Sequence, residues 1–278
     1  MAFVARFETL IGCAAFITAV MSAQGTLGAK TAAFSNFSLV TDGKVVLPGL
    51  LYVPPEAKFD PDVRRPLILF LHGGGEKGTN NKSQVNINID NLLTEAKRRG
   101  VYLYAPQSPG DWDDRGITDQ VVTMIDRAIA EHKVDKSRVY VTGLSSGGCG
   151  TWNMLSRYPD RFAAGIPICA GNPDKDFVPA RLVDRAVFVF HSRDDKGAPA
   201  ATTEQLVNSI LTAAHETLPT YPPAGSLKLY TLPASKIDLN YMEFPTGGHS
   251  IWGAVYGAPE VYDWLFAHGT PKSKAVSR

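Results

Sequence analysis

The 278-residue chain predicts an α/β protein in which a mostly parallel sheet carries helices on both faces. Two observations lead to this fold class. Continuous apolar runs, such as PLILFL at 66–71, are typical of parallel strands that are buried on both sides. These runs alternate with segments of helical apolar spacing, and strands that alternate with helices form crossover units around a parallel sheet.

Local signals define the individual elements in order. We expect strands, rich in β-branched and aromatic residues, at 38–40, 45–53, 66–71, 101–105, 139–142, 186–190 and 241–244. We expect helices, from their apolar periodicity, at 90–99, 117–131, 202–214 and 259–268. Gly100 ends the first helix, and Pro259 suits the first turn of the last one. The segment 216–239 carries four prolines and is longer than a helix–strand connection needs, so we expect an excursion there.

The amino-terminal segment has the pattern of a leader. Arg6 precedes an uncharged apolar stretch at 9–21, and small residues follow it. This pattern resembles a secretory signal peptide ending near residue 23, with an uncleaved anchor as the alternative. It predicts a secreted or periplasmic protein without a membrane span after cleavage. Residues 24–33 are expected to be a flexible lead-in, 34–268 one catalytic domain and 269–278 a disordered tail.

Composition narrows the classes of partner. Lys and Arg number 28 against 27 Asp and Glu, and these charges are scattered along the chain. This balance argues against a nucleic-acid partner, and we expect neither a cofactor nor a metal ion. Cys13 lies in the predicted leader, which leaves Cys149 and Cys169 either as a disulfide or as two free thiols.

The motif GLSSG at 143–147 is the strongest candidate for a catalytic element. It follows the predicted strand 139–142 and precedes a predicted helix. A serine between glycines in a strand–turn–helix context is typical of a nucleophile elbow, in which the hydroxyl stands exposed above the sheet. The alternative is a plain glycine-rich turn. We predict that Ser145 is a nucleophile.

An activated serine needs a base and an acid that orients the base. His249 follows the last predicted strand, and Asp194 and Asp195 follow the strand 186–190. All of these residues therefore lie at carboxyl ends of strands, where open α/β sheets bind ligands. We predict His249 as the base, with either aspartate as the acid. His191 precedes the acid in the chain and is expected to be a packing residue.

A second glycine-rich segment, LHGGG at 71–75, follows the first buried strand. Glycines allow backbone N–H groups to approach a developing negative charge, as in the oxyanion loops of serine hydrolases. We predict that the amide of Gly74, or else that of Gly75, forms an oxyanion hole with the amide of Ser146. His72 is expected to pack beneath this loop.

Longer stretches carry a family resemblance. They are LFLHGGGEKG (69–78), Ala105-Pro106-Gln107, GLSSGGCGTW (143–152), RFAAGIPICAG (161–171), GGHSIW (247–252) and the spacing of His191, Asp195 and Pro199. The chain resembles the α/β-hydrolase esterases that include feruloyl and acetyl-xylan esterases and polyhydroxybutyrate-depolymerase-like enzymes.

This resemblance implies that Ser145, Asp195 and His249 form the catalytic triad. Asp195 is preferred because the family pattern reads His-Gly-x-x-Asp-x-x-Val-Pro. Ser192 and Ala198 replace the Gly and Val of that pattern here, and Asp194 remains the alternative acid.

The resemblance also implies ester hydrolysis through an acyl-enzyme. The expected substrate is a feruloyl or acetyl ester of plant polysaccharide, or a polyester. No bulky insertion precedes the strand at 186–190, so we expect no large cap domain and an open site. Trp112, Trp252 and Tyr256 are predicted to line it, with ordinary packing as the alternative. A serine peptidase or amidase on the same fold is one alternative function, and a catalytically inactive, hydrolase-like binding protein is another.

Overall fold

The computed structural model describes residues 31–60, 62–86, 88–218, 228–231 and 237–270. The predicted leader at 1–23 and nearly all of the predicted lead-in and tail lie outside the described residues. Within the described ranges, no helix has the length and apolar character that crossing a membrane requires.

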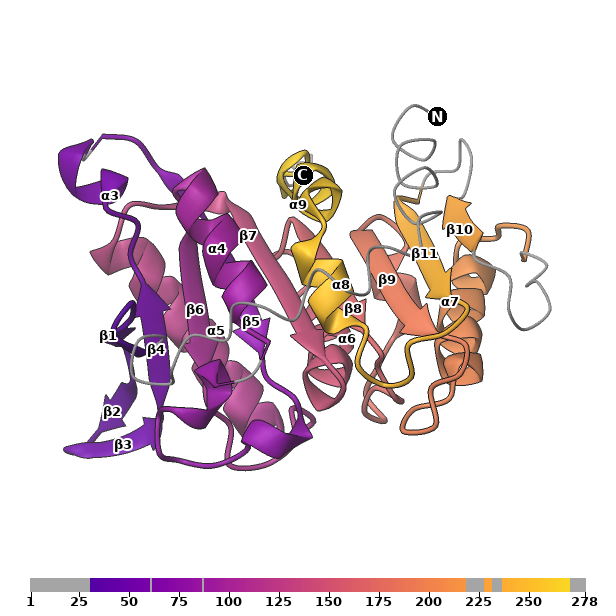
Figure 1. Ribbon diagram of the computed structural model, residues 1–278, viewed down its shortest axis with the longest axis horizontal. Coiled ribbons are helices and arrows are strands. Elements are labelled where there is room, and N and C mark those ends of the chain that lie inside the picture. Colours follow the sequence, from indigo (N-terminus) through magenta and orange to yellow (C-terminus); the bar gives the residue numbers. More distant parts are fainter. Residues whose placement is uncertain (1–30, 61, 87, 219–227, 232–236, 271–278) are drawn as a thin grey trace, which may run out of the picture.

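One large sheet forms the centre of the described structure (Figure 1). In spatial order its strands are β1 (Ser35–Asn36), β4 (Gly49–Tyr52), β6 (Tyr102–Pro106), β5 (Arg65–Leu71), β7 (Val134–Leu144), β8 (Ala164–Ile168), β9 (Ala186–Ser192), β11 (Leu239–Phe244) and β10 (Lys228–Thr231). The strands from β6 to β11 run parallel, and β1, β4 and β10 are antiparallel to their neighbours at the two edges. The predicted mostly parallel sheet is confirmed.

Helices cover both faces of this sheet, as predicted (Figure 1). One face packs against α4 (Asp90–Arg99), α8 (Trp252–Gly257) and α9 (Pro259–Phe266). The other packs against α5 (Arg115–Glu131), α6 (Ser146–Arg157) and α7 (Ala200–Ala213). The central strand β5 feeds the two cores alternately, because successive side chains point to opposite faces. The short α3 (Glu56–Phe59) precedes β5.

The predicted strand 45–53 is wrong in one respect, because Pro48 divides it. A proline has no N–H to donate to a sheet. Before Pro48 the chain forms β3 (Lys44–Leu47), which pairs only with β2 (Leu39–Thr41) in a separate hairpin. After Pro48 it enters the main sheet as β4. The Pro48 carbonyl accepts from the Gln107 N–H at 2.8 Å and so ties this break to the end of β6.

The parallel strands bring the candidate site residues to one edge of the sheet. Ser145 directly follows β7, Asp195 lies on the loop after β9, and His249 lies on the loop after β11. Gly74 lies just beyond β5. Between β8 and β9 the chain forms only the short 3-10 helix η5 (Pro179–Leu182), which agrees with the expected absence of a large cap there.

Candidate active site

The serine occupies a strained turn between β7 and α6. Ser145 has φ 55° and ψ −120°, a backbone conformation that non-glycine residues rarely adopt. Its N–H donates to the Ile168 carbonyl at 2.9 Å, which ties the turn to β8. The flanking glycines are required by space: a Cβ on Gly143 would overlap the Gly147 carbonyl, and one on Gly147 would overlap the Leu71 carbonyl. The sequence therefore folds into a tight turn that exposes one hydroxyl.

The three predicted triad residues form a continuous hydrogen-bonded chain. His249 Nε2 lies 2.8 Å from Ser145 Oγ, and His249 Nδ1 lies 2.7 Å from Asp195 Oδ2. A carboxylate can only accept, so the Nδ1 of His249 carries a proton, and in the neutral ring the Nε2 is then the acceptor for the serine hydroxyl. This tautomer is the one that a general base for serine requires.

Asp195 is buried, and donors surround both of its oxygens. Besides the His249 contact, its Oδ1 accepts from the backbone N–H groups of Gly197 at 2.7 Å and Ala198 at 2.9 Å. Burial alone would raise the pKa of Asp195, but the hydrogen bonds from His249 and the two amides outweigh it and hold the pKa below its ordinary value. Asp195 is therefore ionised at neutral pH and gives His249 a negatively charged partner.

The neighbouring aspartate has a different position. Asp194 is exposed, and its Oδ1 accepts from the Ser192 hydroxyl at 2.7 Å and from the Gly248 N–H at 2.8 Å. The structure thus brings Asp195, and not Asp194, to the imidazole. Through its bond to Gly248, the residue before His249, Asp194 holds the loop that carries the imidazole.

Both predicted oxyanion donors lie at the first position of a helical turn. Gly74 begins the 3-10 helix η3 (Gly74–Glu76), and Ser146 begins α6. The first amides of a helix have no partner within it, so their N–H groups are free to bind an anion. Gly75, the second choice, is the next residue of η3, and a Cβ there would meet no atom within 4 Å.

His72 supports the loop before η3. Its Nε2 accepts from the Ser108 N–H at 3.0 Å, so Nδ1 carries the proton and donates to the Gly73 carbonyl at 2.7 Å. Burial lowers the pKa of His72 to about 4, which keeps the ring neutral. The structure places His72 beneath the loop, where the sequence analysis expected it.

Sequence reasoning missed Asp111. Its Oδ1 lies 2.7 Å from Lys77 Nζ and accepts from the Ser146 hydroxyl at 2.7 Å. Lys77 follows η3, and a Cβ on Gly74 would lie 3.9 Å from its Cε. Asp111 therefore links the two segments that carry the candidate oxyanion donors. No sequence signal identifies it, because its partners are distant in the chain and it is an ordinary exposed aspartate.

The predicted aromatic lining is only partly supported. Trp252 is half-buried and meets the His249 ring edge-on, with centroids 5.6 Å apart. Tyr256, in contrast, is 1% exposed, and its hydroxyl shares a 2.9 Å hydrogen bond with Thr142 Oγ1. The inward face of α8 carries Tyr256 into the core, so the prediction that it lines the site is wrong.

The prediction for Trp112 is wrong for a similar reason. Trp112 is 1% exposed, and its indole N–H donates to the His72 carbonyl at 3.0 Å. Gly150 of α6 makes room for this side chain, since a Cβ there would lie 2.5 Å from the Trp112 Cβ. Trp112 is a wedge between the oxyanion loop and α6, and it has no surface to offer a substrate.

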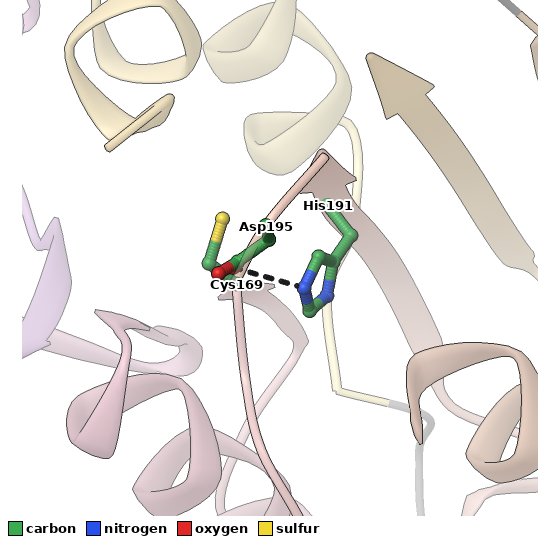
Figure 2. Close-up of side chains that lie close together, drawn as sticks. All are labelled: Cys169, His191 and Asp195. Atoms are coloured by element: carbon green, nitrogen blue, oxygen red, sulfur yellow. Dashed lines mark ion pairs between the residues drawn. The ribbon is translucent and has the colours of Figure 1, made fainter. Parts of the chain in front are cut away.

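Both described cysteines are free thiols, Cys149 half-buried and Cys169 buried. Cys169 converges with His191 and Asp195 (Figure 2), with one potential ligand atom of each within 4.8 Å of the others. The donor set does not suit a metal ion. His191 Nε2 lies 2.7 Å from the Ala198 carbonyl, which only accepts, so this nitrogen carries a proton. Burial raises the pKa of the Cys169 thiol to about 12, so it also keeps its proton.

Comparison with known proteins shows similarity to esterases and to a depolymerase. The poly(3-hydroxyalkanoate) depolymerase C of Paucimonas lemoignei is 47% identical over 68 residues, which are 24% of this chain and 16% of that protein. A bifunctional acetylxylan esterase/xylanase of Neocallimastix patriciarum is 31% identical over 128 residues, or 45% of this chain and 18% of that protein. Among solved structures, a thermostable esterase aligns with TM-score 0.69 and 27% identity, covering 86% of this chain and 64% of the other.

The chain spans less than a fifth of the length of these two curated relatives. A family model gives the broader match: the model for the alpha/beta hydrolase fold matches residues 66–228, more than half of the chain. That match includes Ser145 and Asp195, and His249 follows it on the same edge of the sheet. The chain belongs to the α/β-hydrolase fold family.

Proposed function

We propose that this protein is an exported serine carboxylic-ester hydrolase that acts through an acyl-enzyme. The observation that carries the proposal is the hydrogen-bonded chain from Ser145 Oγ through His249 to Asp195. A serine aligned in this way with a neutral imidazole and a buried carboxylate is activated for attack on a carbonyl carbon. The proposal of export rests on the leader pattern at 1–23.

The reaction follows from the positions of the donors and acceptors. Ser145 Oγ attacks the ester carbonyl while His249 Nε2 takes the hydroxyl proton. The negative charge that develops on the carbonyl oxygen is held by the amides of Gly74 and Ser146. His249 then gives its proton to the departing alcohol. A water molecule, deprotonated by the same nitrogen, attacks the acyl-enzyme and releases the acid.

The oxyanion donors and Asp195 each contribute to the rate of the proposed reaction. Removing one oxyanion donor costs roughly 3–4 kcal/mol of transition-state stabilisation. The charge on Asp195 stabilises the imidazolium formed during each proton transfer and holds the ring in its required orientation. Donors fixed by helix ends and by Asp111 need no reorganisation as the charge appears.

For the substrate we propose an ester of a polymer, either an acetyl or feruloyl group on polysaccharide or a polyester. The short connection between β8 and β9 leaves no cap over the site from that segment, which suits a long chain lying across the sheet edge. The half-buried Trp252 beside His249 offers a flat apolar surface to a ring. The relatives named above act on such polymers by their printed names.

The decisive variant is Ser145→Ala. We expect it to lose all turnover of a p-nitrophenyl acyl ester and all labelling by a fluorophosphonate, with an unchanged melting temperature. Ser209→Ala, which removes a part-buried hydroxyl from α7, is the matched control and should keep both. Turnover by the Ser145 variant would refute the proposal, and a wild-type protein that neither labels nor hydrolyses would be a binding protein.

A panel of substrates separates the remaining possibilities. Wild-type protein is tested on acetylated xylan, a feruloylated oligosaccharide, poly(3-hydroxybutyrate) and peptide p-nitroanilides. The proposal predicts ester cleavage far faster than amide cleavage. Preference for the anilides would instead identify a peptidase that uses the same residues.

A further inference from the structure

Two buried groups face Asp195 and have no part in the proposed reaction. They are Cys169, which directly follows β8, and His191 of β9 (Figure 2). Both are 0% exposed and neither can contact a substrate. We propose that Cys169 and His191 are positioning residues, which hold the Asp195 carboxylate in the orientation that His249 needs. This inference rests on the proposed esterase function.

Cys169 reaches Asp195 from a strained backbone. It has φ 46°, in the left-handed region, although it is not a glycine. Its N–H donates to the Phe190 carbonyl at 2.9 Å, which fixes this conformation, and its Sγ lies within 4.8 Å of a carboxylate oxygen of Asp195. A glycine would adopt this backbone without strain. We therefore infer a use for the side chain that offsets the strain, and its one polar group lies beside the carboxylate.

His191 reaches the same carboxylate from the other side. Its Nε2 lies 2.7 Å from the Ala198 carbonyl and 3.2 Å from Asp195 Oδ2. Both oxygens only accept, so the single Nε2 proton is shared between them. Its Nδ1 lies 2.8 Å from Thr203 Oγ1, and because burial lowers the pKa of His191 and keeps the ring neutral, the Nδ1 accepts from the threonine hydroxyl. Thr203 thus fixes the tautomer that points a donor at Asp195.

The Asp195 carboxylate is surrounded by side chains and backbone amides from several segments of the chain. The Cys169 thiol comes from the residue just after β8, the His191 ring from β9, and the His249 ring from the loop after β11. The amides of Gly197 and Ala198 occupy the remaining oxygen. Three side chains, from the ends of three adjacent strands, therefore surround the carboxylate, and only one of them takes part in proton transfer.

The test combines a rate with a pH profile. Cys169→Ala removes one donor, and we expect kcat to fall about three- to tenfold with KM unchanged, since one hydrogen bond is worth roughly 1 kcal/mol. The carboxylate left less satisfied binds the protonated imidazole more strongly. The acid limb of kcat/KM should therefore move to higher pH by about half a unit to one unit. His191→Leu should act in the same direction.

Conservative and control variants distinguish positioning from packing. Cys169→Ser keeps a donor in place and should restore the wild-type profile. Cys169→Gly relieves the backbone strain, so we expect it to fold as stably as Cys169→Ala or better, yet to show the same kinetic loss. Thr203→Val should reproduce part of the His191 effect, because it frees the ring to change tautomer. Cys149→Ala removes the other described thiol, which lies in α6, and should behave as wild type.

The outcome is clear in each case. A fluorophosphonate label at one equivalent per chain in every variant shows that Ser145 is intact, so a failure here is separate from a failure of the esterase proposal. If Cys169→Ala and Cys169→Gly both keep the wild-type acid limb, the thiol has no positioning role and the inference is overturned. The same holds if the serine variant is no better than the alanine one. If His191→Leu does not fold, Thr203→Val against Thr203→Ser gives the comparison for the imidazole.

Discussion

Replacement of Asp195 by asparagine is the sharpest perturbation of the proposed mechanism. Asparagine has one acceptor oxygen where the carboxylate has two. If that oxygen stays on the amides of Gly197 and Ala198, the new NH2 group faces His249 Nδ1, and the imidazole must switch to its Nε2–H tautomer. The Nε2 then has no lone pair for the proton of Ser145. If the oxygen faces His249 instead, the NH2 group meets two amide donors, at a cost of about 1–3 kcal/mol for each group left unsatisfied.

In the first orientation the NH2 group also faces the Nε2–H of His191, but that donor keeps its shorter contact with the Ala198 carbonyl. The first orientation is therefore favoured, and it removes the base. A wrong tautomer of this kind lowers kcat about 10⁴-fold, which corresponds to roughly 5.4 kcal/mol of activation free energy. The measurement is kcat for p-nitrophenyl acetate, with circular dichroism and the melting temperature to verify the fold.

The matched control for this variant is Asp194→Asn. The single oxygen of that asparagine can still accept from both Ser192 and Gly248, so we expect kcat within about threefold of wild type, as for most surface changes. An Asp195→Asn variant within tenfold of wild type would refute the reasoning, as would a larger loss in Asp194→Asn.

Three further outcomes follow from the packing around the site. Gly147→Ala should destabilise the fold by about 3 kcal/mol or more, because its Cβ would overlap the Leu71 carbonyl. The control Gly110→Ala, whose Cβ would meet no atom within 4 Å, should leave the melting temperature nearly unchanged. Equal melting temperatures for the two variants would contradict this. Trp112→Ala should cost about 3–5 kcal/mol in urea unfolding, and a near-neutral result would show that Trp112 is not the wedge described above. Since His72 titrates near 6.5 when unfolded and at about 4 when folded, only the unfolded state takes up this proton as the pH falls between these values. Stability is then lost by about 3 kcal/mol over that range, and His72→Gln should flatten the dependence in urea unfolding at pH 7 and 4.5.

Local signals determined much of the fold. The helix predicted at 90–99 is α4 with the same bounds, and Gly100 ends it at φ 61° because only glycine adopts that conformation without strain. The buried run at 66–71 is all but the first residue of β5. These elements depend on signals within a few residues, and such signals are visible in the sequence.

Features that depend on tertiary packing were not visible. An aromatic residue near a motif can face the site or the core, and the space beside Gly150 decided this for Trp112. Adjacent aspartates after a strand point to different sides of their loop, so local signals left both open. The family pattern favoured Asp195, and the folded structure brings Asp195, and not Asp194, to His249. The role of Asp111 comes from two partners about 35 positions away in either direction.

The parallel pairing of β9 with β11 has a consequence for how this chain tolerates variation in length. Ser192 lies opposite Phe244 at the ends of these strands, and Asp195 and His249 follow within a few residues. The separation of acid and base is therefore fixed by strand register and is independent of the number of residues that connect α7 to β11. Changes in the length of that connection outside β10 can therefore leave the proton path intact.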